Sequence, residues 1–320
     1  MIFDNIILDT AVLAFLGGCF GACLGGLWVF VLDGLLVLLG CAVVLAGGSD
    51  FLLLQIALGP LFGPQTTFLG GAFAASYAAG IRKNHPGGSG SDIISPLLGT
   101  SWDVLLVGGA GATACALLAS AVIPHLPLLN RTDGLAVSIV IISLIGRFLF
   151  HREGPCGKKE SIKKFGLLGT NNYAISWLPW LAQPSRLLIV GASVGCLAGA
   201  SAMFCERILQ PMVQAGSVAA GTAYVIPYIF FWSVSAVMLA ALQLGQGATQ
   251  KIPVTHGIAV LGAAAYLGSH SLLVAILGGI FGAFLQEFCA RCFNNHGSDH
   301  VDPPAFVITL GILLYSFIPW

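Results

Sequence analysis

The sequence predicts an all-α polytopic membrane protein, on the basis of its composition and the spacing of its charges. Of its 320 residues, 57% are hydrophobic and only 8% are charged, whereas soluble domains carry about 25% charged residues. The charges gather in clusters and leave uncharged stretches at 11–32, 104–130, 208–250 and 252–286. A helix crosses a bilayer with about 20 apolar residues, so these stretches are long enough to do so.

The charge balance and the cysteines exclude two other classes of protein. The 13 basic and 13 acidic residues give a net charge of zero, which leaves no basic surface of the kind that nucleic-acid binding requires. The 9 cysteines lie mostly in apolar runs, where Cys acts as a small buried hydrophobe. We therefore expect neither a nucleic-acid partner nor a disulfide framework.

Four short matches, in the same order in both parts of the chain, predict two homologous halves. The glycine-rich stretch 17–25 matches 191–199, and Pro64-Gln65-Thr66 matches Pro253-Val254-Thr255. Further along, 107–109 matches 277–279, and 133–136 matches 302–305. We therefore expect a first repeat at 1–150, a linker at 151–184 and a second repeat at 185–320.

Each half is expected to hold five transmembrane helices, about ten in total. They fall at 11–32, 34–56, 63–81, 103–124 and 134–150, and then at 186–206, 217–245, 253–269, 272–293 and 303–319. The runs 34–62 and 208–250 have room for a broken or re-entrant helix as well. Because five is an odd number, the halves should cross the membrane in opposite directions, as inverted-topology repeats.

The basic residues predict which side of the protein faces the cytoplasm. If the N-terminus lies outside, 11 of the 13 Lys and Arg residues lie on the inner side, and only Arg131 and Arg207 lie outside. Cytoplasmic loops carry the excess of basic residues. We therefore expect a plasma membrane of the bacterial type, two extracytoplasmic termini, and a cytoplasmic linker 151–184 that lies on anionic lipid headgroups.

The first candidate site consists of two helix starts at matching places in the halves. Gln65, Thr66 and Thr67 come after a proline in the first half, and Thr255 and His256 do so in the second. Free N–H groups at such helix starts attract an anion or a polar solute, so these five residues are candidates for substrate binding. A histidine side chain ordinarily titrates near neutral pH, so His256 is also a candidate for proton coupling. The alternative is ordinary helix initiation by proline, with local Thr capping and a structural His256.

The second candidate site is acidic and lies at two other helix starts. Asp133 and Asp302 each precede a predicted helix, which is typical of N-cap residues. The alternative is that both carboxylates, together with His300, couple or gate transport. Glu287 lies inside an apolar stretch, where a carboxylate has to face protein or water, so it is a further coupling candidate.

The segment 296–302 also suggests a metal site. If Gly297 interrupts the helix, His296 and His300 converge with Asp302 or Asp299 on one metal ion. The alternative is that the two histidines and the aspartates have separate structural partners.

The leading functional hypothesis is a secondary transporter, permease or channel for a small solute or ion, with its substrate site between two inverted repeats. The sequence lacks metalloprotease and P-loop motifs, and we expect no enzyme and no cofactor. One alternative is an intramembrane metal-dependent enzyme or divalent-metal carrier that uses His296, His300 and Asp302. Another is the membrane subunit of a larger transport assembly. The expected partners are the lipid bilayer, the small solute or ion, and a second copy of the chain, bound through the glycine-rich faces.

Overall fold

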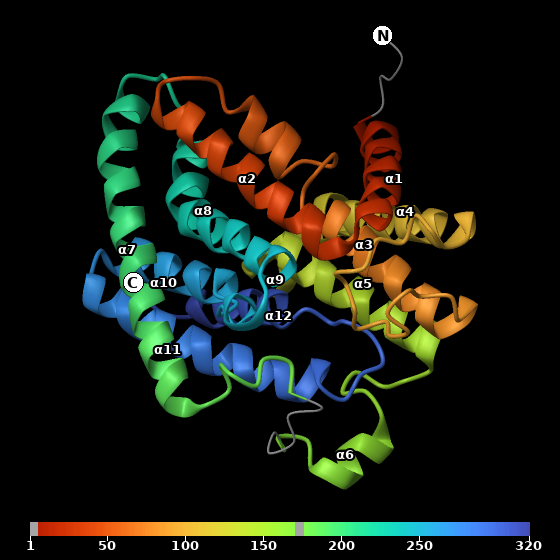
Figure 1. The fold of residues 1–320 in the computed structure, drawn as a ribbon. Coiled ribbons are helices and arrows are strands. Elements are labelled where there is room, and N and C mark those ends of the chain that lie inside the picture. The colour runs from red at the N-terminus through yellow and green to blue at the C-terminus, as the bar shows by residue number, and fades with distance from the viewer. Residues whose placement is uncertain (1–5, 170–175) are drawn as a thin grey trace.

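The computed structural model describes residues 6–169 and 176–320, and within these ranges every regular element is a helix (Figure 1). The main helices are α1 (Ile6–Leu24), α2 (Gly26–Leu45), α3 (Thr67–Tyr77), α4 (Trp102–Leu117), α5 (Gly134–His151), α6 (Lys159–Phe165), α7 (Pro184–Gln214), α8 (Ala220–Met238), α9 (Ala240–Leu244), α10 (His256–Ser269), α11 (Leu272–Cys289) and α12 (Pro303–Tyr315).

Seven helices are long and apolar enough, by length and composition, to cross a membrane. They are Ile7–Leu24, Gly26–Leu45, Trp102–His125, Gly134–His151, Pro184–Gln214, Ala220–Leu244 and Leu272–Asn294. A helix satisfies its own backbone hydrogen bonds, which is why it is suited to a lipid environment. The chain is thus an α-helical membrane protein, as its composition predicts.

The first two predicted spans, 11–32 and 34–56, have the wrong boundaries. The chain turns at Gly25, which has a positive φ of 92° that only glycine adopts readily. The turn is held by the N–H of Leu27, which donates to the carbonyl of Ile93 at 2.9 Å. Asp33, which the sequence suggested as the break, is wholly buried inside α2. The acidic residue therefore lies within the membrane helix, and the glycine ends the preceding one.

The long apolar runs 34–62 and 208–250 each contain more than one piece. After α2, a short π-helical turn, η1 (Leu52–Ala57), and the turns at 58–66 lead into α3. After α8, the short α9 and a 3-10 turn, η6 (Gly247–Gln250), lead into α10. The helices that follow, α3 and α10, begin inside the helix bundle, where Thr66, Thr67, Thr255 and His256 are buried.

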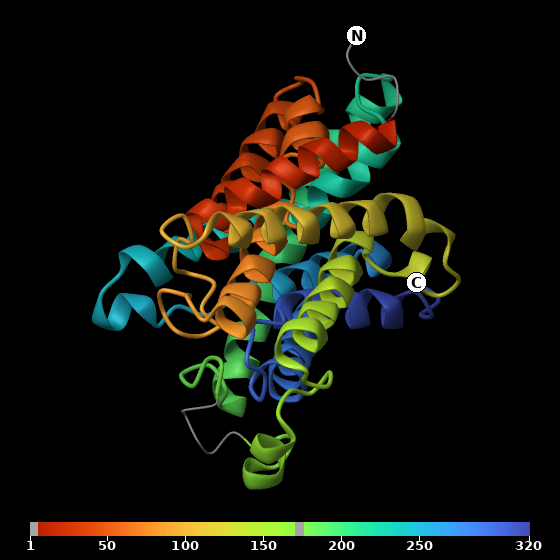
Figure 2. The ribbon, with the colours of Figure 1, turned by 90° about the vertical axis from the view of Figure 1, so that its right-hand side faces the viewer.

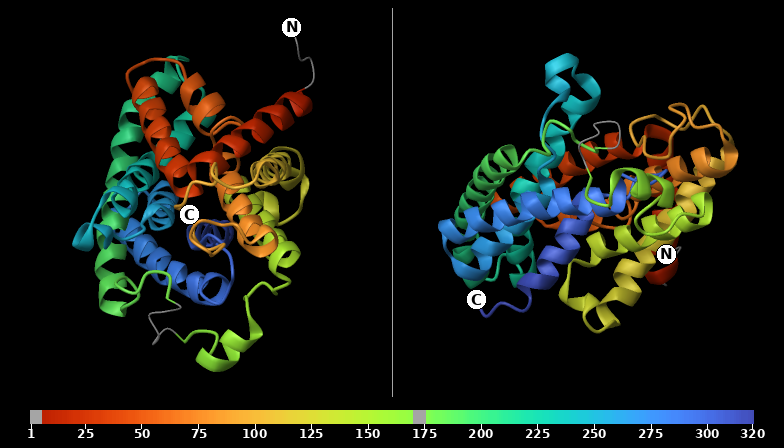
Figure 3. Two further views of the ribbon diagram at one scale, coloured as in Figure 1. Left: turned by 45° about the vertical axis from the view of Figure 1, so that its right-hand side comes forward. Right: turned by 90° about the horizontal axis from the view of Figure 1, so that it is seen from below.

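The helices pack in two similar groups joined by contacts between their members. α1 packs against α3 and α4, and α7 packs in the same way against α10 and α11. Between the groups, α2 lies beside α8, and α5 lies beside α12. Figure 1 and Figure 3 show α7 along one edge of the molecule and the short α6 standing apart from the bundle.

The glycine-rich faces pack within their own groups. A Cβ atom added to Gly17 would lie 2.5 Å from the carbonyl oxygen of Leu61, and one added to Gly195 would lie 2.5 Å from that of Ala275. The close backbone approach that the small residues predict is therefore present. These contacts are made with the turn before α3 and with α11, so the glycines named here pack within their own groups, and the second copy of the chain stays a prediction.

Candidate functional site

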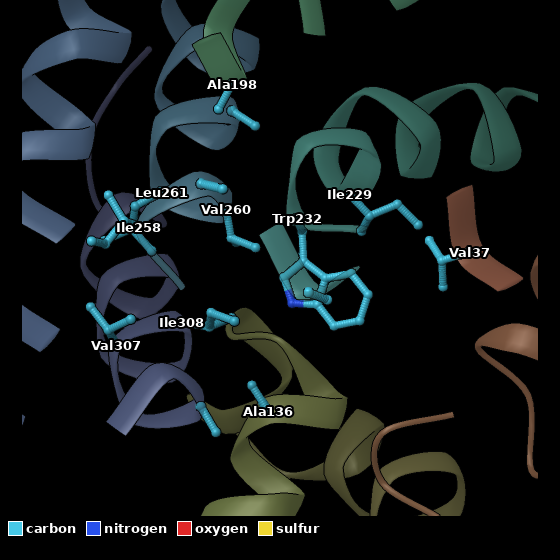
Figure 4. Close-up of a cluster of buried hydrophobic side chains, with 14 of the residues drawn as sticks. Val37, Ala136, Ala198, Ile229, Trp232, Ile258, Val260, Leu261, Val307 and Ile308 are labelled. Carbon is cyan, nitrogen blue, oxygen red and sulfur yellow. The ribbon is translucent and has the colours of Figure 1, made fainter. Parts of the chain in front are cut away.

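A central cavity lies among α2, α5, α8, α10 and α12, with space for water of about 70 Å³. Figure 4 shows part of its wall, where the indole of Trp232 lies between Ile229 and Val260, with Ala136 and Ile308 nearby. The cavity is lined by Phe30, Leu58, Pro64, Phe68, Asp133, Leu135, Ala136, Ile139, Tyr228, Ile229, Trp232, His256, Val260, Asp302, Ala305 and Ile308. Residues from both predicted halves therefore form one cavity.

Two aspartates face this cavity from the starts of α5 and α12. Each one caps its helix as predicted: the Asp133 carboxylate accepts the N–H of Ala136, and that of Asp302 accepts the N–H of Ala305, both at 2.9 Å. The other Asp133 oxygen accepts from the Tyr228 hydroxyl at 3.2 Å. Because each carboxylate is an N-cap and also lines the cavity, the capping and functional interpretations do not exclude each other.

His256 provides the imidazole of the central cavity. Its ring packs against Phe30 at 4.8 Å and Trp232 at 6.3 Å between centroids. The side chain is buried, and its Nδ1 atom has no hydrogen-bond partner among the described residues. A buried ring nitrogen without a partner is costly, which makes it available to a ligand or to water in the cavity.

A second cavity, the vestibule, has a volume of about 340 Å³. It shares Phe30, Phe68, His256 and Asp302 with the central cavity. The candidate residue His300 also lines the vestibule. The remaining walls come from Leu27, from the loop at 91–94, from Trp177, Leu178 and Trp180 of the linker, and from Leu239, Leu242, Gln250 and Val254 near α9. The four shared residues therefore lie between the vestibule, which is next to the loops, and the deeper central cavity.

Asp92 shapes the loop that borders the vestibule. Its carboxylate accepts the hydroxyl of Ser95 at 2.6 Å and the N–H groups of Ile94 and Ser95 at 2.9 and 3.1 Å. Burial acts to raise the pKa of Asp92, but these hydrogen bonds and the nearby His85 outweigh burial, so the pKa is lowered. The loop is therefore held in a defined shape beside the vestibule.

Four of the five residues of the first candidate site are not among those that line either cavity. The Gln65 amide donates to the carbonyls of residues 58 and 59 at 3.1 and 3.2 Å, and the Thr67 hydroxyl donates to that of residue 62 at 2.8 Å. Thr66 and Thr255 are buried beside the helix starts, and only His256 lines the cavities. The proline motifs do converge, since Pro64 and His256 line the same cavity.

The histidines of the candidate metal site have separate partners. His296 Nδ1 lies 2.8 Å from the Ser161 hydroxyl, and its Nε2 lies 3.2 Å from the carbonyl of residue 167. His300 Nε2 lies 3.2 Å from the Asp302 carboxylate. Across residues 6–169 and 176–320, no group of three or more His, Cys, Asp or Glu side chains is arranged to hold a metal ion. The convergence expected for His296, His300 and Asp302 is therefore not found.

The remaining acidic candidates form ion pairs. Asp299 pairs with Arg147 of α5 at 2.6 Å, and both side chains are almost wholly buried. Glu287 pairs at 2.7 Å with Arg291, which lies four residues further on in the π-helical turn η7 (Ala290–Asn294) that follows α11. Glu287 is not among the residues that line the two cavities. These pairs give both acids a structural role.

Sequence reasoning missed Tyr228, Asp33 and the aromatic rings of the cavities. Tyr228 follows Pro227 inside α8, and proline within a helix was a local signal that this stretch is unusual. Asp33 is a lone carboxylate in an apolar run, which is itself a signal. The aromatic rings had no such signal, because a Phe or Trp in an apolar helix looks the same whether it faces lipid or a cavity.

Comparison with known proteins gives a family. No curated protein and no solved structure matches the chain. One family model, described as a family of unknown function (DUF7973), matches it twice, over residues 2–158 and over residues 158–319. Since these two matches together extend over nearly the whole sequence, the chain belongs to this family.

Proposed function

We propose that this chain is a membrane transporter or channel built from two inverted repeats, and that a small solute or ion passes through the central cavity. The observation that carries the proposal is the convergence of Asp133, His256 and Asp302, each at or next to a helix start, on one cavity. Ionisable groups inside a membrane protein are costly and usually mark a pathway. Transporters with inverted repeats bind their substrates between the repeats, at interrupted helices.

The twofold family match supports the assignment of two repeats. The packing agrees with it, because α1, α3 and α4 make the same set of contacts as α7, α10 and α11. α4 and α11 also both end in a π-helical turn, η3 (Leu118–Val122) and η7 (Ala290–Asn294). If α2 corresponds to α8 and α5 to α12, the contacts of α2 with α8 and of α5 with α12 join corresponding helices. Such contacts are expected when two repeats are related by a twofold axis.

The directions of corresponding helices support an inverted arrangement. α5 ends beside α3, where His151 Nε2 lies 3.1 Å from the Ser76 hydroxyl. This end is near the loop 83–101, whereas α12, the counterpart of α5, ends at the C-terminus. In Figure 2 that loop and α9 project from one side of the molecule, and the C-terminus lies on the opposite side with the connection 123–133. Corresponding helices thus run from the cavity toward opposite sides.

The lining favours a small cation or a neutral polar solute over an anion. Two carboxylates and one imidazole face the central cavity, and its described lining contains no Lys or Arg. The carboxylates of Asp133 and Asp302 already accept N–H groups at the starts of α5 and α12. These N–H groups are therefore not free to bind an anion. The rings of Phe30 and Trp232 present faces that attract cations. A volume of about 70 Å³ limits the solute to the size of a few water molecules.

In this proposal the solute passes through the vestibule and then between two aromatic rings before it reaches the central cavity. Phe30 and Phe68 line both cavities, and their ring centroids lie 5.3 Å apart. We assign these rings to a narrow passage between the vestibule and the solute site. A solute that enters from the loops then meets the rings before it reaches Asp133.

Flux into liposomes tests the proposal. Purified protein is reconstituted, and the uptake of small cations and of neutral polar solutes is measured for the parent and for Asp133→Asn, Asp302→Asn and His256→Ala. A lost hydrogen bond to a charged group costs about 1.5–3 kcal/mol, so we expect each variant to lose about tenfold or more of the uptake at low solute concentration.

The matched control is Asp103→Asn, which changes a carboxylate that pairs with Arg82 outside both cavities. It should transport as the parent does, and size-exclusion profiles establish that all four variants are folded. A parent protein without flux of either solute class, or three cavity variants with parental flux, would contradict the proposal.

A further inference from the structure

Asp33 is a further buried acid, separate from those of the central cavity. It lies in the middle of α2, its side chain is 0% exposed, and neither carboxylate oxygen has a hydrogen-bond partner among the described residues. Asp133, Asp299 and Asp302 differ from it, because each of them accepts at least two hydrogen bonds or pairs with a charge. The role of Asp33 is therefore not explained by capping or by an ion pair.

Contacts along α2 place Asp33 opposite the turns that lead into α3. Gly26 and Gly40 lie seven residues before and after Asp33, which is about two helical turns, so the three residues share a face. A Cβ atom added to Gly26 would lie 3.2 Å from the carbonyl oxygen of Phe68, and one added to Gly40 would lie 2.8 Å from the Cα atom of Leu53. The face that carries Asp33 is thus covered by the chain between Leu53 and Phe68.

This covering segment contains other buried polar atoms without partners. They are the hydroxyl oxygen of Thr66 and the amide oxygen of Gln65. Side chains with free oxygen atoms are unusual in a tightly packed interior, because each such atom costs free energy unless it finds a partner. The segment that covers α2 therefore contains, near Asp33 in the fold, further buried oxygen atoms that can accept a hydrogen bond.

No charged group of the described residues compensates a negative charge on Asp33. α2 packs against α1, α3, α7, α8, α9 and η1. The titratable residues on these elements are Asp9, Cys19 and Cys23 on α1, Tyr77 on α3, Arg186, Cys196, Cys205, Glu206 and Arg207 on α7, and Tyr224 and Tyr228 on α8. Tyr77, Glu206 and Tyr228 contact other partners, namely Asp103, His270 and Asp133. Within the described chain none of the eleven contacts the Asp33 carboxylate, and neither does Cys41 of α2 itself.

We propose that Asp33 is a proton-binding site that takes up and releases one proton as the interface between α2 and the 58–66 turns closes and opens. In the closed arrangement described here the carboxyl group is uncharged, because a bare carboxylate without partners is not stable inside a membrane protein. Opening of the interface admits water, and the proton then leaves. One proton is bound and one is released, and no other reactant takes part.

Phe30 connects this site to the central cavity. It lies one helical turn before Asp33 on α2, lines both cavities and packs on His256. A movement of α2 that exposes Asp33 also moves Phe30. Proton release would thereby be coupled to passage between the vestibule and the solute site. This coupling rests on the transport function proposed above, whereas proton binding by Asp33 does not.

Labelling with dicyclohexylcarbodiimide tests proton binding without any transport assay. This apolar reagent adds to protonated carboxylic acids, without a leaving group, and mass spectrometry of the peptides locates the adduct. We expect the full-length protein in detergent to be labelled at Asp33, less strongly as the pH rises. Asp33→Asn should lack this adduct, and Asp103→Asn should keep it. An Asp33 peptide that is recovered unlabelled at every pH would overturn the proposal, and so would labelling of Asp33 that does not change with pH.

A second measurement tests the coupling to transport. In liposomes with a pH gradient, Asp33→Asn should transport at a rate that no longer depends on the gradient, while Asp103→Asn retains the dependence. Because Asn is close to the uncharged acid in size and polarity, the variant should remain folded. If the parent has no flux but Asp33 is still labelled in a pH-dependent way, only the transport function fails. If Asp33→Asn keeps the full dependence on the gradient, Asp33 is not the coupling residue.

Discussion

At the scale of single residues, the buried ion pair between Arg147 and Asp299 joins segments that are far apart in the sequence. Arg147 lies near the end of α5, and Asp299 lies in the turn before α12. Besides this pair, the Arg147 guanidinium donates to the carbonyls of Pro155 in the linker and Phe293 in η7, and so holds both segments as well. A guanidinium with several donors suits such a junction, because it satisfies several carbonyls at once.

Asp299→Asn should destabilise the protein strongly. The change leaves the Arg147 charge buried without its counterion, and breaking a buried pair on one side costs about 3–5 kcal/mol. The melting temperature in detergent measures the effect. The control is again Asp103→Asn, because the pair with Arg82 is partly exposed and such pairs contribute less than about 1 kcal/mol. Equal melting temperatures for the two variants would show that Arg147 does not depend on Asp299.

At the scale of the helices, glycines decide where backbones approach each other. The contacts of Gly21 with Thr67, and of Gly195 with Ala275 and Gly279, leave no room for a side chain. Close helix approach through small residues is a common means of packing in membranes, where lipid gives helices little hydrophobic reason to associate. The glycine spacing predicted this approach, but which helix is approached depends on the tertiary fold.

Gly21→Leu and Gly195→Leu should each lower stability by overpacking, with a cost of about 1–3 kcal/mol or more. A thermal shift in detergent measures this cost. Gly221→Leu is the matched control, because a Cβ atom at Gly221 would meet nothing within 4 Å, although the residue also lies in a helix. If all three variants melt at the same temperature, the α1 and α7 faces are not tightly packed.

At the scale of the whole molecule, the proposed orientation in the membrane rests on the distribution of charges and on the helix directions. The loop 83–101 is polar and begins with Lys83 next to Arg82, and the linker 151–184 is rich in basic residues. Basic residues are enriched on the cytoplasmic side. The vestibule lies beside this loop and the linker. If the proposed orientation is right, the vestibule faces the cytoplasm.

Labelling of single cysteines on a cysteine-free background tests this orientation. Ser89→Cys and Glu160→Cys should react with an impermeant thiol reagent from the cytoplasmic side only. Asn130→Cys and Gln214→Cys should react from the opposite side only. All four positions are exposed, so the side of the membrane decides whether they react. Reaction of residues 130 and 160 from one side would contradict the proposed topology.

Part of the candidate site could be predicted from local sequence. Asp133 and Asp302 were recognisable as N-caps, because capping involves only the next three residues. His256 was recognisable as an unusual residue at an apolar helix start. That Tyr228 bonds to Asp133 from 95 residues away could not be predicted, since it depends on how α8 lies against α5.

The sequence by itself determined that this protein is helical and membrane-embedded, because composition and local periodicity decide both. It also contained the signals for the helix caps and for close packing at glycines, which are contacts between neighbours or consequences of size. The tertiary structure alone decided that Gly25 rather than Asp33 ends the first helix, that the glycine faces pack within their own groups, and that His256 rather than the buried threonines lines the cavities. Those outcomes depend on contacts between segments distant in the chain, and no local pattern encodes which surfaces will meet.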